Sequence, residues 1–194
     1  MQKNLPRVFL FIDEFNFKNL ASLNKNIDII YRNYKKKINK SILLSLKAFC
    51  KRQKRKLYIS NNIKLAKKLD IDGVYIPSFN KKLNLLNINA RKKFSIIGSA
   101  HNKKEVIIKN HQNCKLIFLA PLFKTIKSKN NLNISRYNLI TLDEKRKFIA
   151  LGGINEKNFS QIYLTNSVGF AGIRWIKKNG PRKFLRPFLK LNLL

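Results

Sequence analysis

Acidic residues are scarce in this sequence: nine Asp and Glu stand against 42 Lys and Arg, a formal net charge of +33 over 194 residues. Such a surplus is typical of proteins with polyanionic partners, and it makes nucleic acid one candidate partner. Lys, Asn and Ile are also abundant, as in proteins encoded by A/T-rich genomes, so codon drift explains part of the excess. We therefore do not expect nucleic acid to be the main partner.

Cysteines and long apolar runs are also few. Cys50 and Cys114 have no partner spacing, which excludes a disulfide framework and a cysteine metal site. The longest apolar run, residues 116–123, has eight residues and contains a proline, so it is too short to cross a bilayer. The run at residues 8–12 ends at Asp13-Glu14, which argues against a signal peptide. We expect a cytoplasmic protein without a membrane span.

The apolar residues are numerous enough, at 44%, for a packed core, and the length fits a single domain over residues 1–194. Short continuous apolar runs recur along the chain and are typical of parallel strands buried on both faces. They predict strands at residues 7–12, 28–31, 56–60, 73–76, 94–98, 115–119, 148–151 and 168–172. Segments between them have helical spacing, with capping residues at 60–62 and at Asn155.

Eight strands, each followed by a helix-like segment, predict a single small (β/α)₈ TIM barrel of the α/β class. The alternative is an open doubly wound sheet, which normally has a glycine-rich turn after its first strand. Here Asp13-Glu14-Phe15 follows that strand and the glycines come late, so the barrel is favoured.

The tightest basic clusters, at residues 51–56, 91–93 and 145–147, all come just before predicted strands. In a parallel barrel, these positions lie at the mouth opposite the catalytic one. We predict that Lys54, Lys92 and Arg146 share that mouth, away from residues 120–131. Most of the charge then does not steer substrate.

Paired glycines end the seventh predicted strand in the sequence ALGGI at residues 150–154. Gly152 and Gly153 let backbone N–H groups approach an anion, and the loops after strands seven and eight of such barrels commonly bind phosphate. The alternative is a tight turn without a ligand. Arg174, after the eighth strand, either clamps the same phosphate or is a solvated helix residue.

A long polar loop follows the sixth strand, with the sequence APLFKTIKSKNN at residues 120–131. Its hydroxyls and lysines suit a pyrophosphate, although a solvated loop is the alternative. At the end of strand five, Ser99 and His101 do not predict a hydrolytic triad, because no orienting acid is evident. We expect Ser99 to donate a hydrogen bond to a ligand.

Four motifs in order resemble the thiamine phosphate synthase and TenI family. The sequences LYISN at 57–61 and DGVYI at 72–76 resemble its INDR…GVHLGQ block. The sequence IGSAH at 97–101 resembles GVSxH, APLFKT at 120–125 resembles GPxFxT, and ALGGI at 150–154 resembles AIGGI. The resemblance covers roughly residues 8–176.

The resemblance implies transfer of a hydroxymethylpyrimidine group from its pyrophosphate to a thiazole phosphate, with release of pyrophosphate. It implies that Arg32, Ser99, Lys127 and Lys129 are catalytic residues. It also implies a set of substrate- and phosphate-binding residues, namely Ser60, Thr125, Gly152, Gly153, Ile173 and Arg174. The partners expected are small phosphorylated molecules.

Several family positions are altered in this chain. Asn61 and Asn80 stand where the family has its Mg²⁺-binding aspartates, so we expect no metal site and weak Mg²⁺ dependence, if any. Ile30 and Tyr34 replace the Gln and Lys of the family's QxRxK motif, and Pro121 replaces the His of relatives that isomerise the thiazole. The alternative to a synthase is an impaired relative that binds a thiamine precursor or another phosphate ligand.

Overall fold

The computed structural model describes residues 7–23, 26–34, 38–83, 93–126, 130–173 and 175–176. These described ranges contain eight strands: β1 Arg7–Ile12, β2 Ile27–Tyr31, β3 Leu57–Ser60, β4 Gly73–Ile76, β5 Ser95–Ala100, β6 Leu116–Leu119, β7 Lys147–Leu151 and β8 Ser167–Gly172. The helices between them are α1 Phe17–Ala21, α2 Lys40–Arg52, α3 Ile63–Lys68, α4 Lys103–His111, α5 Asn133–Thr141 and the 3₁₀ helix η1 Phe159–Leu164.

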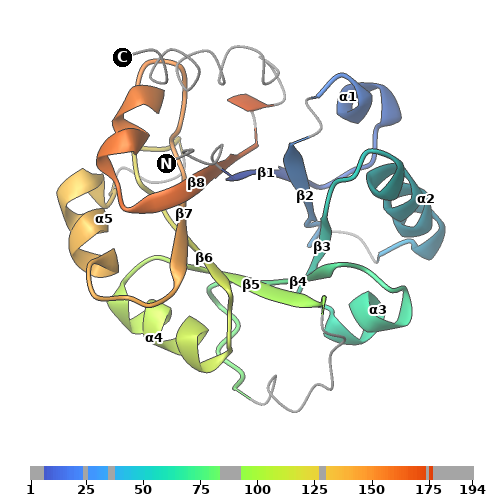
Figure 1. Cartoon of the computed structure of the whole chain (residues 1–194), viewed down its shortest axis with the longest axis horizontal. Helices are drawn as coiled ribbons and strands as arrows, with labels where there is room; N and C mark the ends of the chain where they lie inside the picture. Colours follow the sequence, from blue (N-terminus) through green and yellow to red (C-terminus); the bar gives the residue numbers. More distant parts are fainter. Residues whose placement is uncertain are drawn as a thin grey trace.

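The strands form one closed parallel barrel in sequence order, and the helices lie outside it (Figure 1). Closure is set by β1, in which Val8 pairs with Ile27 of β2 on one side and with Phe170 of β8 on the other. This confirms the predicted (β/α)₈ barrel and excludes an open doubly wound sheet. The predicted strands overlap all eight observed ones, with ends that differ by at most two residues.

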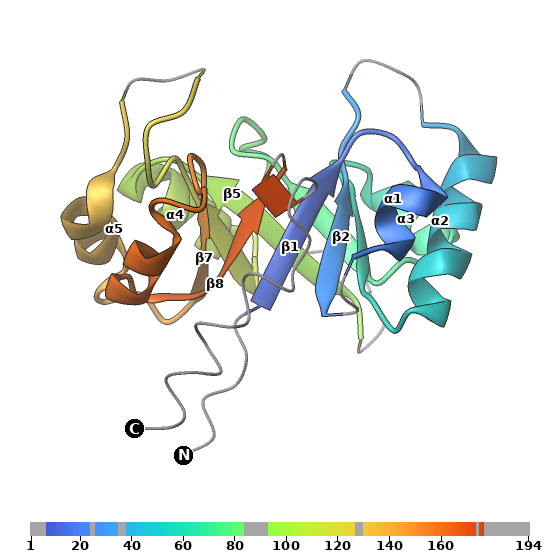
Figure 2. The same cartoon turned by 90° about the horizontal axis from the view of Figure 1, so that it is seen from above.

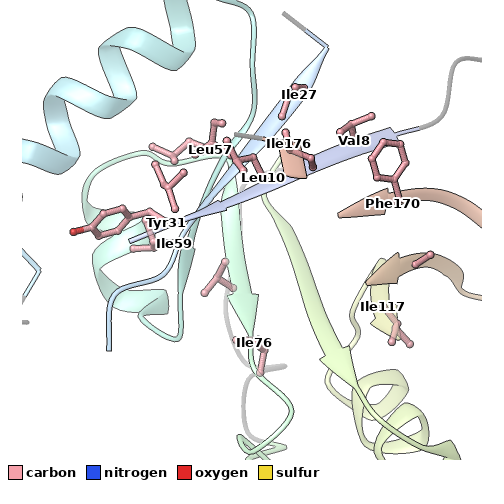
Figure 3. Close-up of a cluster of buried hydrophobic side chains, with 14 of the residues drawn as sticks. Val8, Leu10, Ile27, Tyr31, Leu57, Ile59, Ile76, Ile117, Phe170 and Ile176 are labelled. Carbon is pink, nitrogen blue, oxygen red and sulfur yellow. The ribbon is translucent and has the colours of Figure 1, made fainter. Parts of the chain in front are cut away.

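Two apolar layers explain why the strand sequences are continuously apolar. Side chains alternate along each strand, so Phe9 and Phe11 point into the barrel while Val8 and Leu10 point toward the helices. Aromatic rings fill the interior, where the Phe118 ring centroid lies 5.0 Å from Phe9 and 5.8 Å from Tyr75. Figure 3 shows part of the outer layer, to which β1, β2, β3 and β8 all contribute.

The helix starts follow the capping rule at α3 but not after β7. Asn62 caps α3 as expected, because its side-chain oxygen accepts a hydrogen bond from Leu65 N at 3.0 Å. The helix predicted to begin at Asn155 is wrong: a turn occupies residues 155–158 and η1 begins at Phe159. Asn158 is the reason, since its side chain accepts from Asn155 N at 2.9 Å and donates to Gly153 O at 2.9 Å. In the described part of the β4–β5 connection, residues 77–83 and 93–94, there is no helix either.

All strands run in the same direction, so their amino ends meet at one mouth and their carboxyl ends at the other (Figure 2). Lys54 precedes β3 and Arg146 precedes β7, which places both at the amino-end mouth, away from Gly153. Arg146 donates a hydrogen bond there to Asn113 Oδ1 at 3.1 Å. The predicted basic mouth is confirmed for these two residues, and Lys92 lies outside the described residues. No helix in the described ranges has the length and apolarity of a membrane span.

Candidate active site

The carboxyl-end mouth of the barrel collects polar side chains from several strands. Ile30, Tyr58 and Ile97 point into the interior, and the residues two positions further along the chain are Arg32, Ser60 and Ser99. The same alternation that packs the barrel therefore directs these three polar side chains toward its open end. Ser60 and Ser99 are buried, whereas Arg32 is half-buried.

Tyr75 links two of these groups. Its hydroxyl donates to Ser99 Oγ at 2.8 Å, which leaves the Ser99 hydroxyl hydrogen for another acceptor. Burial raises the pKa of Tyr75 to about 12, although the Ser99 hydroxyl and the Arg32 guanidinium oppose that rise. Tyr75 therefore stays protonated near neutral pH. The Arg32 guanidinium lies 4.7 Å from the centroid of the Phe11 ring, a cation–π arrangement that holds the charge over the barrel interior.

A groove of about 550 Å³ adjoins this mouth between the β3–α3 turn and the segment that follows β4. Its lining includes Lys64, Lys81 and Lys82, so it is positively charged. Phe79 also lines the groove, and its ring centroid lies 5.7 Å from that of Tyr34 in an edge-to-face contact. The Tyr34 hydroxyl is 3.1 Å from Ser60 Oγ. The groove suits an anionic group attached to a flat ring.

The donor set at the family's metal positions does not fit Mg²⁺. Asn80 Nδ2 donates to Asn61 Oδ1 at 2.6 Å, so the two amides bind each other. Mg²⁺ favours carboxylate oxygens and gives up its water reluctantly to neutral ligands. In the described chain, no group of three His, Cys, Asp or Glu side chains converges on one point either.

The paired glycines after β7 pack directly against the segment that follows β6. Gly152 and Gly153 have φ values of +94° and +72°, which side chains rarely allow. A Cβ on Gly153 would lie 2.5 Å from the carbonyl oxygens of Phe123 and Lys124. Gly152 O also accepts from Phe123 N at 3.1 Å. The glycines therefore fix the β6 loop beside the β7 turn, a role the sequence did not reveal.

The remaining predicted site residues fall into two groups. Thr125 is half-buried in the segment after β6, and Ile173 lies just beyond β8 and is partly exposed. Lys127, Lys129 and Arg174 lie outside the described residues. Their predicted roles in binding phosphate stay predictions.

The expectation that no acid orients His101 is wrong. Glu105 Oε2 accepts from His101 N at 2.8 Å and lies 3.0 Å from its Nδ1, while Asn102 caps α4. Glu105 is the third residue after the N-cap Asn102, the spacing of a capping box, but it accepts from the residue before the N-cap. That spacing is visible in the sequence. Ser99 bonds to Tyr75 instead, so the two residues do not form a nucleophile pair.

Three further residues at or near the site, Tyr75, Phe79 and Lys109, were not predicted from the sequence. Tyr75 occupies an inward position of β4, so strand alternation could have placed it beside Ser99. Lys109 lies three residues after Val106, on the face of α4 that packs on the barrel. That helical phase was the available signal for a buried lysine.

The closed parallel barrel, with cationic groups, hydroxyl groups and paired glycines at its carboxyl-end mouth, is a (β/α)₈ barrel, a class in which the loops at this mouth commonly bind phosphate. Residues 22–176 match the family model described as thiamine monophosphate synthase. The chain belongs to this family.

Curated relatives agree with this assignment, and a solved structure shares the fold. A thiamine-phosphate synthase of Flavobacterium psychrophilum is 31% identical over 140 residues, which cover 66% of this chain and 66% of the relative. One of Prochlorococcus marinus is 32% identical over 124 residues, 60% of this chain and 34% of the relative. The match therefore spans about two thirds of the length of the first relative and about one third of the length of the second. The thiamine phosphate pyrophosphorylase structure from Pyrococcus furiosus shares the fold, with a TM-score of 0.77, 16% identity and 99% of each chain covered.

Proposed function

We propose that this chain is a thiamine phosphate synthase, which joins hydroxymethylpyrimidine pyrophosphate to a thiazole phosphate and releases pyrophosphate. One observation carries the proposal: Arg32, Ser60 and Ser99 occupy one side of the mouth, and the Gly152-Gly153 turn occupies the other. Strands β3 and β7 are four strands apart in the closed sheet, so Ser60 lies across the barrel from the glycine turn. Arg32, after β2, and Ser99, on β5, lie three and two strands from β7. Two phosphorylated substrates need two such regions.

The proposed reaction needs electrostatic stabilisation more than proton transfer. The bond between the pyrimidine methylene carbon and the pyrophosphate oxygen breaks, and the electron pair leaves with the pyrophosphate. The lone pair of the thiazole nitrogen then forms the new carbon–nitrogen bond. Arg32 and the lysines of the groove stabilise the departing polyanion, and the apolar interior beneath them excludes water.

Ser60 and Ser99 orient the pyrimidine in this proposal. Tyr75 fixes Ser99 by donating to it, so the serine hydroxyl donates to a ring nitrogen of the substrate. The Tyr34 hydroxyl lies 3.1 Å from Ser60 Oγ, where either hydroxyl can donate, and it holds Ser60 in place. We also propose a cytoplasmic location, small phosphorylated molecules as partners, and at most a weak contribution from Mg²⁺.

The proposal is tested by thiamine phosphate formation from both substrates, with and without Mg²⁺. Arg32→Ala should lower kcat/KM about 10- to 100-fold, the scale of one charge-assisted hydrogen bond lost at about 1.5–3 kcal/mol. Arg52→Ala is the matched control, because Arg52 is exposed at the end of α2 before the amino-end mouth. Equal activity of the two variants would contradict the role of Arg32.

A second candidate is a relative that binds its ligand without turnover. The Asn61–Asn80 hydrogen bond favours it, because neutral amides replace charged groups at the pyrophosphate side. Absence of thiamine phosphate with and without Mg²⁺, together with binding of thiazole phosphate, would select this candidate. The described basic clusters lie at the mouth away from the site, so they do not contact substrates bound there. We do not propose nucleic acid as the main partner.

A further inference from the structure

Lys109 is a charged side chain that the interior of the protein encloses completely. It lies on α4, is 0% exposed, and its Nζ donates to Pro77 O at 2.9 Å, Asn80 O at 2.9 Å and Gln112 Oε1 at 2.8 Å. An ammonium group has three N–H donors, so all of them are used. Among the described residues, no carboxylate forms an ion pair with it.

Gln112 extends the same network. It is also 0% exposed, and its Nε2 donates to Asn80 O and to Lys82 O, both at 2.9 Å. Lys109 and Gln112 together therefore bind three carbonyl groups of residues 77–82. Within this segment, Asn80 N donates to Pro77 O at 3.1 Å and Lys82 N to Asn80 Oδ1 at 3.0 Å. The segment is thus fixed by α4 as well as by its own turn.

The barrel leaves room for this contact at Gly98 of β5. A Cβ on Gly98 would lie 2.9 Å from Lys109 Cδ and 2.8 Å from Cys114 Sγ. The aliphatic part of Lys109 therefore passes over β5 where that strand has no side chain. From there the Lys109 side chain reaches the end of β4, the strand that pairs with β5.

The segment held by Lys109 forms one wall of the groove at the mouth. Phe79 contacts Tyr34 and Asn80 contacts Asn61, so both reach residues that follow other strands. Burying an ammonium group costs several kcal/mol before its hydrogen bonds are counted, and burial lowers the pKa of Lys109. An apolar side chain would avoid this cost. What the ammonium group does that an apolar side chain would not is fix the conformation of residues 77–82.

We infer that Lys109 and Gln112 are positioning residues. They act through residues 77–82 to hold Phe79 and Asn80 in the conformation that shapes the groove for a pyrophosphate group. The identity of that ligand rests on the proposed function, whereas the fixing of the segment does not.

Lys109→Met tests the inference, because methionine keeps an unbranched chain and removes the charge. Lys104→Met is the matched control, since Lys104 is an exposed residue of the same helix. Hydrogen exchange at the amides of Asn80 and Lys82 should become at least tenfold faster in Lys109→Met, while exchange in β1 and β6 stays unchanged. Affinity for inorganic pyrophosphate should fall about tenfold, and affinity for thiazole phosphate should not change. If Lys109 acted only on the stability of the fold, the substitution would change the affinities for both ligands alike.

Two outcomes would overturn the inference: wild-type exchange at residues 80 and 82 in a folded Lys109→Met protein, or pyrophosphate affinity equal to that of Lys104→Met. If Lys109→Met does not fold, Gln112→Met supplies the same measurements with the charge retained. A wild-type protein that binds pyrophosphate but forms no thiamine phosphate would refute the proposed function and leave this inference standing.

Discussion

Asn61 and Asn80 show how single side chains set the chemistry of the site. Both follow strands whose ends the barrel brings together, and their amides bond at 2.6 Å. Carboxylates at this separation would repel each other unless a cation lay between them. The amide pair therefore offers Mg²⁺ no charged ligand, and Lys64, Lys81 and Lys82 line the adjoining groove.

We predict that Asn61→Asp combined with Asn80→Asp creates Mg²⁺ affinity that the unmodified protein lacks, because two carboxylates replace two neutral ligands. Isothermal titration with MgCl₂ should show binding by the double variant and none by wild type at millimolar concentrations.

The control for this prediction is Asn62→Asp, which adds a carboxylate to the same groove while keeping an N-cap residue for α3. Binding of Mg²⁺ by wild type as tight as by the double variant would contradict the account.

At the scale of elements, the turn after β7 and the loop after β6 form one unit. The two glycines approach the backbone of residues 121–124 too closely for any side chain, and Leu122 N donates to Leu151 O at 2.9 Å. The proposed phosphate region therefore depends on contacts between two loops as well as on glycine flexibility.

Gly153→Ala should lower the free energy of unfolding by about 2–3 kcal/mol, because its Cβ meets two carbonyl oxygens at a positive φ. Gly172→Ala is the control, since among the described residues a Cβ there meets the Ile176 side chain, at 3.2 Å, and no backbone atom. Urea denaturation measures both. A Gly153→Ala protein as stable as Gly172→Ala would show that the loop moves aside at little cost.

Helix α4 is tied to the end of α5 by a second polar network. Lys103 Nζ lies 2.8 Å from Glu144 Oε1, and Asn110 Nδ2 donates to Glu144 Oε2 at 2.8 Å. Burial alone would raise the pKa of Glu144, but the hydrogen bonds from Lys103 and Asn110 lower it below its ordinary value of 4.5. The ionised form is thus the one the fold stabilises.

Glu144→Gln should therefore cost stability above about pH 4.5, and the difference from wild type should shrink as the pH falls through the lowered pKa. We expect about 0.5–1 kcal/mol, because Lys103 is partly exposed and solvent weakens the pair. Urea denaturation at pH 7 and at pH 3.5, with Asp143→Asn as control, measures this. A difference that grows toward acid would refute the assignment.

At the scale of the whole molecule, the dominant long-range interaction is the repulsion among the charges that make up the net charge of +33. Cations lie on both mouths, as Lys54 and Arg146 at one and Lys64 and Lys81 at the other show. Like charges on a compact body repel each other, and this repulsion weakens in the expanded unfolded chain.

Added salt should therefore stabilise the fold. Raising NaCl from about 0.02 M to 0.5 M shortens the Debye length from roughly 20 Å to 4 Å, and we expect Tm to rise by several degrees. KCl at the same concentrations is the control, because an equal rise excludes specific sodium binding. A constant or falling Tm would contradict the role of self-repulsion.

The sequence by itself determined the architecture, the strand positions and the outline of the phosphate region. Strands buried on both faces must be continuously apolar, so a run such as Val8–Ile12 can be recognised as a strand from the sequence alone. The direction of parallel strands then places Arg32, Ser99 and Gly153 at one mouth. These properties depend on local pattern and on chain order, which sequence contains.

Only the tertiary structure decided which side chains meet. The Tyr75–Ser99, Asn61–Asn80 and Lys109–Asn80 contacts join residues 19 to 29 positions apart, through distances that strand register and helix rotation set. The helix start predicted at Asn155 is wrong for the same reason, because the Asn158 side chain bonds to Gly153 and stabilises a competing turn. Hydrogen-bond partners are decided at a scale of a few ångströms, and sequence pattern alone does not reach that precision.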